Sequence, residues 1–227
     1  MYKFLFAIYR ILVPKSLRTV ILKKNLRRKI SAYFKSISQV ELNDDQKEIL
    51  DFLESNQVRI FPYPFHDNYS PDKIDVKYDP EKSMRFIMHD GKRLYFKKRW
   101  GLSHIKRAYS DLLREQDPGS PHRYLTDKFM IGENEVIADI GAAEGNFSLS
   151  VIEKAKKIYL FEYDREWIEA LEATFAPWKE KIEIIGKYVS NRNDDSHIRF
   201  DTFSKDNKDV TFLKIDVDGA ESEVLEG

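Results

Sequence analysis

Residues 136–152 impose the strongest constraint on how this chain can fold. Val136–Ile140 is a continuous apolar run typical of a buried strand, and a turn bounded by Gly141 and Gly145 follows it. From Asn146 onward the pattern is that of a helix. A strand, a tight turn and a helix begin a βαβ unit, in which consecutive strands of one sheet run parallel.

Strands and helices alternate through the rest of the C-terminal half. Parallel strands are buried on both faces, which explains why the strand segments are continuous apolar runs. The expected elements are a strand at 136–140, a helix at 146–156, a strand at 157–162, a helix at 165–175, and strands at 182–185 and 210–215. The sequence therefore predicts an α/β fold with a parallel sheet.

The residues before 121 have a different texture. Asn43 can cap a helix that runs to about Ser55, with two acids in its first turn. Asp90-Gly91 between two apolar runs predicts a tight hairpin, because both residues accept positive φ angles. A further helix is expected from Ser103 to Glu115.

Asp117-Pro118-Gly119-Ser120-Pro121 then interrupts the chain, and we place a domain boundary there. Three parts are expected: a basic amphipathic segment at 1–40, an accessory α+β region with the hairpin at 41–120, and a cofactor domain at 121–227.

Charge is unevenly distributed in this cysteine-free chain. Net charge is zero, yet residues 1–130 carry 26 Lys and Arg against 16 Asp and Glu, and the first 40 residues contain no acid. A basic head can attract anionic lipid or nucleic acid. The absence of cysteine excludes disulfides and thiolate metal sites.

The apolar run from Phe4 to Val13 is interrupted by Arg10 and falls short of the ~20 residues of a membrane span. No small-residue cleavage site follows it, so we expect a cytoplasmic protein without a signal peptide. Two interpretations of residues 1–35 stay open. They could contact a membrane surface peripherally, or pack on the domain as a helix with a solvated face.

The turn after the first strand has the features of a ligand-binding loop. Gly141 and Gly145 let the backbone approach a ligand where a Cβ would collide, and open α/β sheets bind ligands at the carboxyl ends of strands. The spacing departs from the dinucleotide fingerprint Gly-x-Gly-x-x-Gly, because Ala143 and Asn146 interrupt it, and no Walker lysine is present. An ordinary tight βα turn is the alternative for this segment alone.

Acids follow two later strands. Glu162 ends the second strand, where a carboxylate can accept hydrogen bonds from a ribose diol. Asp216 ends the last strand and could bind the amino-acid part of a cofactor, orient an acceptor hydroxyl or act as a base. Asp164 is better explained as a helix cap. Asp218 and Glu221 could cap the next helix or add a metal ligand, and we assign no metal site.

These segments resemble the FkbM family of S-adenosylmethionine-dependent methyltransferases. The resemblance rests on Val136–Gly145, Leu160–Asp164, Tyr188–Asn191 and, most specifically, Leu213–Gly227, although the family usually has Glu where Asp218 stands. It covers about residues 121–227. It implies a class I methyltransferase (Rossmann-like) fold, S-adenosyl-L-methionine as cofactor, and methyl transfer to an oxygen, often on a sugar or natural product.

The resemblance also implies a set of site residues. Asp216 would lie at the catalytic edge as well as in the cofactor site, and Tyr188 to Ser190 would lie near the adenine. The implied cofactor-binding residues are Asp139, Gly141, Ala142, Ala143, Glu144, Gly145, Asn146, Glu162, Tyr188, Ser190 and Asp216.

Two residues just before the cofactor domain are further candidates. His122 could act as a base or hold substrate, and the alternative is a histidine on a surface turn. Tyr124 could cover the methionine end of the cofactor. The familiar class I sheet has three more strands after the one ending at Asp216, so we expect a C-terminally truncated domain with an exposed apolar edge.

The leading hypothesis is an O-methyltransferase for a hydroxyl of a glycan or related small metabolite. One alternative is an amino-group methyltransferase for nucleic acid, but Asp216-Val217-Asp218-Gly219 stands where such enzymes carry an Asn/Asp-Pro-Pro-aromatic tetrapeptide. A nicotinamide-dependent oxidoreductase lacks its fingerprint here. A third alternative is a non-catalytic membrane-surface or scaffolding module with a vestigial methyltransferase fold. We therefore expect a small-molecule or glycan acceptor and no nucleic-acid partner.

Overall fold

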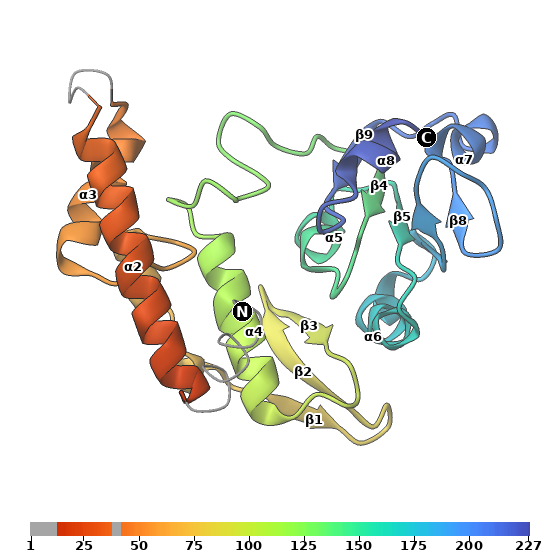
Figure 1. Cartoon of the computed structure of the whole chain (residues 1–227). Helices are drawn as coiled ribbons and strands as arrows, with labels where there is room; N and C mark the ends of the chain where they lie inside the picture. The colour runs from red at the N-terminus through yellow and green to blue at the C-terminus, as the bar shows by residue number, and fades with distance from the viewer. Residues whose placement is uncertain (1–12, 38–41) are drawn as a thin grey trace. The chain divides into compact units, whose positions relative to one another are not determined.

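The computed structural model describes residues 13–37 and 42–227 (Figure 1). The chain divides after Tyr69 into two compact units, and each is described by itself. Residues 1–12 and 38–41 of the predicted basic segment and its junction lie outside the described residues. Among the residues that the structure describes, no helix has the length and apolar character of a membrane span.

The N-terminal unit is built on α2 (Lys15–Lys35) and α3 (Asp44–Ser55), followed by the 3-10 helix η2 (Pro64–Asn68). The predicted cap of α3 is confirmed. The Asn43 side chain accepts the Gln46 N–H at 2.8 Å, and the Asn43 N–H donates to Gln46 Oε1 at 3.0 Å. This capping box satisfies two backbone donors. The helix α2 buries none of its residues.

The C-terminal unit, Ser70–Gly227, contains the two sheets that matter for the site. Its elements are η3 (Pro71–Lys73), β1 (Lys77–Asp79), β2 (Met84–His89), β3 (Lys92–Tyr95), α4 (Leu102–Glu115), β4 (Val136–Ile140), α5 (Asn146–Val151), β5 (Lys157–Phe161), α6 (Arg165–Phe175), η4 (Ala176–Trp178), β6 (Ile182–Ile185), β7 (Tyr188–Val189), β8 (His197–Ile198), α7 (Phe200–Asp206), β9 (Phe212–Ile215) and α8 (Glu221–Leu225).

The predicted hairpin is confirmed. β2 and β3 pair antiparallel with His89 opposite Lys92, and the two turn residues have φ angles of 48° at Asp90 and 77° at Gly91. Positive φ at both positions is the geometry of a primed two-residue turn. β1 adds a third strand on the far side of β2.

The predicted parallel sheet is also confirmed, and with it the α/β, Rossmann-like architecture. Its strand order is β6-β5-β4-β9, and all four strands pair parallel. From β4 the chain moves outward through β5 to β6 and then returns to place β9 on the other side of β4 (Figure 1). Such a reversal of strand order creates a crevice beyond the carboxyl ends of the strands, where α/β proteins bind ligands.

The hairpin packs on a helix of the parallel sheet. Phe86 and Tyr95 form a buried cluster with Ala170 and Ala173 of α6. The Tyr95 N–H, at the edge of its sheet, donates to the Thr174 hydroxyl at 3.0 Å. The hairpin, α4 and the parallel sheet thus share one compact unit, and the boundary predicted near residue 120 falls inside that unit.

Four element boundaries differ from the prediction. β5 ends at Phe161 rather than Glu162, and α4 starts at Leu102 rather than Ser103. α5 ends at Val151 rather than Lys156, because the chain must turn there to start β5 at Lys157. β9 starts at Phe212 rather than Val210. The Thr211 N–H is nevertheless bonded to the Val136 carbonyl at 2.8 Å, so the difference lies within the usual uncertainty of strand ends.

Candidate functional site

The turn between β4 and α5 is a tight loop that only glycine fits at two positions. Gly141 has a φ of 77°, and a Cβ there would lie 1.9 Å from the carbonyl oxygen of Asp216. Gly145 has a φ of 80°, and its Cβ would lie 2.7 Å from Leu171 Cδ2 and 2.8 Å from Phe175 Cε2. The loop therefore lies directly against the end of β9 on one side and against α6 on the other.

A buried ion pair supports this loop from below. Asp139 has no solvent exposure; its Oδ1 lies 2.9 Å from Lys214 Nζ, and its Oδ2 accepts the Ser148 hydroxyl at 2.6 Å. Lys214 also donates to the Gly141 carbonyl at 2.7 Å. Asp139 was predicted to line a cofactor site. The structure places it beneath the loop, where it orients Lys214.

Glu162 joins the loop to the end of β5. Its Oε2 accepts the Ala143 N–H at 3.0 Å, and its Oε1 accepts the N–H groups of Tyr163 and Asp164, each at 2.8 Å. Three backbone donors therefore hold the carboxylate at the carboxyl edge of the parallel sheet. Asp164 caps α6 as predicted, since its Oδ1 accepts the Glu166 N–H at 2.9 Å.

A cleft with a volume of about 410 Å³ opens beside Glu162. Strand ends, the glycine loop and the segment after β6 form its walls. Six of the predicted site residues line it, namely Gly141, Ala143, Glu162, Tyr188, Ser190 and Asp216. The sequence prediction thus brought together residues that are up to 75 positions apart in the chain.

Aromatic and polar groups distinguish the outer wall of the cleft. The rings of Tyr163 and Tyr188 stack with their centroids 4.3 Å apart. The Ser190 hydroxyl is buried and has no hydrogen-bond partner among the described residues. A buried hydroxyl without a partner is rare, and Ser190 is one of the residues that line this cleft.

Lys97, just beyond β3, also lines the cleft, although the sequence analysis did not predict it as a site residue. Its ammonium lies 2.6 Å from Asp164 Oδ2 and 4.5 Å from the centroid of the Trp167 ring. The hydrogen bond from Lys97 lowers the pKa of the Asp164 carboxyl. The signal available in the sequence was the run Lys97-Lys98-Arg99. These three pair with Asp164, Glu169 and Glu166 of the α6 region.

A second, smaller pocket of about 160 Å³ lies on the other side of the loop. It shares Gly141, Ala143, Asp216 and Asp218 with the cleft. Its further lining includes Ala142, Glu144 and Asn146, which were predicted, and Glu115, Tyr124 and Lys214. Within the described part of the chain, no group of three or more potential ligands is arranged to hold a metal ion.

This smaller pocket is rich in desolvated acids. The Tyr124 hydroxyl donates to Asp216 Oδ2 at 2.6 Å, and burial together with that bond raises the pKa of Tyr124. Burial and the charge of Asp216 raise the pKa of Glu115. Burial raises the pKa of Glu144 to about 7. A pocket of this kind favours a positively charged ligand over a neutral one.

Besides Asp139, two other predicted site residues line neither cavity. Gly145 lies behind the loop against α6. His122 is exposed and lies near enough to Glu115 for its charge to affect that pKa. Of the two candidates before the cofactor domain, Tyr124 is the one that contacts Asp216.

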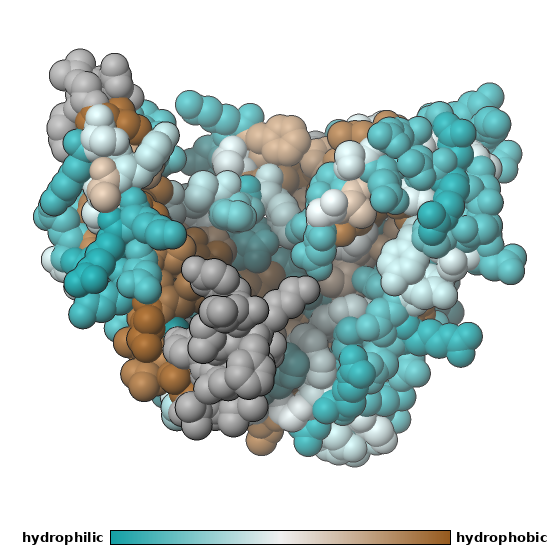
Figure 2. All heavy atoms as spheres, in the orientation of Figure 1, coloured by the Kyte–Doolittle hydropathy of each residue, from teal (hydrophilic) through white to brown (hydrophobic). Residues whose placement is uncertain are grey.

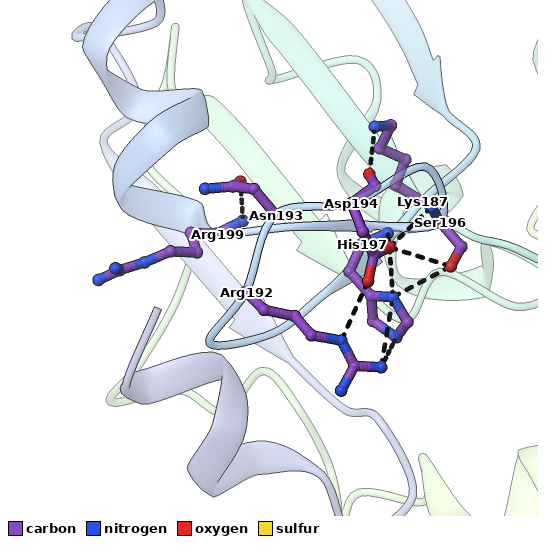
Figure 3. Close-up of polar contacts among 7 residues, drawn as sticks. All are labelled: Lys187, Arg192, Asn193, Asp194, Ser196, His197 and Arg199. Carbon is purple, nitrogen blue, oxygen red and sulfur yellow. Dashed lines mark hydrogen bonds and ion pairs between the residues drawn. The ribbon is translucent and has the colours of Figure 1, made fainter.

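The segment between β7 and β8 is held by a network that the sequence did not reveal (Figure 3). Asp194 Oδ1 accepts His197 Nδ1 at 2.8 Å and the Ser196 N–H at 2.9 Å, and its Oδ2 accepts Arg192 Nε at 3.1 Å. The bond from His197 holds the pKa of Asp194 far below its usual range. Since His197 lines the cleft, the network fixes part of its wall.

The match to a family model lies at the C-terminal end of this chain. Residues 187–227 match the model of the methyltransferase FkbM domain. No curated protein matches the sequence. A methyltransferase FkbM from Methylobacillus flagellatus KT is similar in structure, with 14% identity and a TM-score of 0.37 over 55% of this chain and 39% of its own.

A tRNA m1G37 methyltransferase of M. jannaschii is similar with 14% identity and a TM-score of 0.30, over 75% of this chain and 51% of its own. The chain therefore spans less than two thirds of either structure. At these TM-scores neither likeness bears on the assignment of the site.

Proposed function

We propose that this chain is a methyltransferase of the FkbM type, whose domain model matches residues 187–227, and that it transfers a methyl group from S-adenosyl-L-methionine to a hydroxyl group. The observation that carries the proposal is the hydrogen bond between the glycine loop and Glu162. The Ala143 N–H donates to Glu162 Oε2 at the carboxyl edge of β4 and β5, on the wall of the cleft. In α/β folds that bind nucleotide cofactors, a glycine turn lets the backbone approach the ligand and an acid on a neighbouring strand bonds to the ribose.

The cleft fits the adenosine part of the cofactor. The hydroxyls of a ribose would donate to the Glu162 carboxylate, sharing its oxygens with the three backbone N–H groups. Tyr188 offers an exposed ring for stacking against a base. The Ser190 hydroxyl, buried without a partner among the described residues, would gain a hydrogen bond.

The smaller pocket suits the charged end of the cofactor. Glu115, Glu144 and Asp216 line it, and a sulfonium and an ammonium group both carry positive charge. Lys214, the cation in that lining, is already paired with Asp139. Desolvated carboxylates interact strongly with a cation, because little water competes with them.

S-adenosylmethionine, when bound, supplies an activated methyl group, and the protein supplies orientation, exclusion of water and a proton acceptor. Asp216 lines both cavities, so we propose that its carboxylate accepts the proton of the acceptor hydroxyl. The Tyr124 hydroxyl donates a hydrogen bond to Oδ2 of that carboxylate. This bond fixes the orientation of the carboxylate and leaves Oδ1 for the acceptor. Tyr124 is therefore a positioning residue in this mechanism.

The acceptor class follows from the FkbM resemblance. A hydroxyl of a glycan or a related small metabolite is the substrate we propose. The rival of a non-catalytic module with a vestigial fold is not favoured, since the glycine loop, Glu162 and Asp216 all meet at one cleft.

A transfer assay with a labelled methyl group on S-adenosylmethionine tests the proposal. Candidate polysaccharides and small polyhydroxylated compounds should take up label, whereas RNA and amines should not. Asp216→Asn should abolish transfer even at saturating S-adenosylmethionine, although loss of its charge also weakens binding of S-adenosylhomocysteine, and Asp209→Asn, an exposed acid outside both cavities, serves as the matched control. Label that enters RNA alone would contradict the acceptor class.

A further inference from the structure

The helix α2 carries an unusual concentration of unpaired positive charge. It has eight Lys and Arg among its 21 residues and no acid. Within residues 13–37 and 42–227, none of these eight forms an ion pair. The Arg27 guanidinium donates to the backbone carbonyl of Glu54, which leaves its charge uncompensated. The helix therefore presents an electropositive surface about 30 Å long.

Large apolar side chains share that surface. Leu22, Leu26 and Tyr33 are 58%, 39% and 62% exposed. Their spacings of four and seven residues place them on one stripe along the helix. Leu17, Val20 and Ile21 are exposed on another side of it. Arg18 and Lys29 lie next to this stripe by the same geometry. Figure 2 shows apolar and hydrophilic atoms side by side over α2.

We infer that α2 is a docking surface for a membrane that contains anionic lipid. The basic side chains match the negative headgroups, and the stripe of Leu22, Leu26 and Tyr33 can enter the boundary between headgroups and acyl chains. Long Lys and Arg side chains can reach the headgroups while their stems lie along the apolar layer. Buried apolar area and attraction to anionic lipid both strengthen the binding of a helix at a membrane surface, and α2 offers both kinds of side chain.

A nucleic acid would contact the basic side chains of this surface but would gain nothing from its apolar stripe. Phosphates would satisfy the basic side chains, but exposed leucines gain nothing from a phosphate backbone. The apolar stripe therefore favours lipid as the partner. The inference concerns the N-terminal unit and does not depend on the proposed methyl transfer, so a failure of either leaves the other standing.

Sedimentation of the full chain with vesicles tests the inference. The chain should sediment with vesicles of phosphatidylcholine and phosphatidylglycerol, and remain in solution with phosphatidylcholine alone. Lys15 and Lys29 are exposed and lie seven residues before and after Leu22, on the side of the stripe. The pair Lys15→Gln with Lys29→Gln should weaken binding by about fivefold for each charge removed. The pair Lys154→Gln with Lys205→Gln removes the same charge from exposed sites of the other unit and should change little.

A second pair separates lipid insertion from simple charge attraction. Leu22→Asn with Leu26→Asn leaves the charge unchanged and removes exposed side chains only, so it should fold normally, which circular dichroism will check, and lose vesicle binding. Retention of full binding by this pair would overturn the inference. So would absence of binding to anionic vesicles, or RNA binding that competes with vesicles and survives the leucine changes.

Discussion

Replacing Lys97 with Met should weaken both the fold and the cofactor site. The change removes the 2.6 Å ion pair with Asp164 and the contact of the ammonium with the Trp167 ring, while it keeps an apolar stem of similar length. Lys97 is 8% exposed but Asp164 is 40% exposed, so solvent screens the pair, and we assign it about 1 kcal/mol. The cation–π contact adds about 1 kcal/mol.

The free energy of unfolding should therefore fall by about 2 kcal/mol, which corresponds to a decrease of about 4–8 °C in Tm for a unit of this size. The Asp164 carboxyl has a lowered pKa, so the ion pair stabilises the fold above the unfolded value of 3.8 and loses this effect as the pH falls through the folded pKa. The difference in Tm between wild type and Lys97→Met should shrink accordingly in acid.

Binding gives the more specific readout. Lys97 fixes Asp164, whose N–H donates to Glu162, so the variant should raise the Kd for S-adenosylhomocysteine about tenfold, equivalent to about 1.4 kcal/mol. Lys98→Met is the matched control, because Lys98 pairs with Glu169 at half-exposed positions outside the cleft. Titration calorimetry well below either Tm compares them. Equal Kd values for Lys97→Met and wild type would refute the positioning role of Lys97.

Three further changes test separate parts of the site. Gly141→Ala requires a Cβ 1.9 Å from the Asp216 carbonyl at positive φ, so it should cost about 3 kcal/mol of stability and abolish cofactor binding; an unchanged thermal melt would show that this contact is wrong. Glu144 has its pKa raised to about 7, so its carboxylate destabilises the fold fully above pH 7 and not at all below its unfolded pKa of 4.5. Glu144→Gln should accordingly raise the free energy of unfolding by about 1 kcal/mol at pH 8, allowing for partial solvent access, and should leave it unchanged at pH 4. Chemical denaturation measures this difference, and equal increases at both pH values would contradict this cause. Tyr124→Phe keeps the ring beside Phe147 but frees Asp216, so kcat should fall about tenfold while the Kd for S-adenosylhomocysteine stays constant, and a change in Kd alone would exclude the positioning role.

Strong local signals made much of the fold predictable. β4, β6 and α6 begin and end at the predicted residues. Continuous apolar runs define the strands, and the Asp164 cap defines the start of α6. The hairpin was predictable because Asp90-Gly91 admits few other conformations.

The region between 186 and 206 was not predictable in the same way. β7 and β8 have two residues each, too few to show a periodic pattern. Their geometry depends on hydrogen bonds such as that between Asp194 and His197, which no spacing rule anticipates.

The site shows the same division. Gly141, Glu162 and Asp216 follow strands directly, so the parallel topology alone brings them to one edge. Lys97 and Tyr124 reach the site through contacts with residues 67 and 92 positions away. Only the packing of the hairpin, α4 and their connection against the sheet reveals such partners. Sequence reasoning predicted that Asp139 lines the cofactor site. Nothing in the local sequence indicates that its side chain is buried beneath the loop.

The most direct measurement is a calorimetric titration of the full chain with S-adenosylhomocysteine, repeated on Glu162→Ala. A saturable isotherm is expected for the wild type, with a Kd at least tenfold weaker for Glu162→Ala. Glu183→Ala, which removes a half-exposed acid on β6 outside both cavities, should bind like the wild type. Absence of binding at about millimolar ligand, or equal Kd values for the wild type and Glu162→Ala, would contradict the assignment of this cleft.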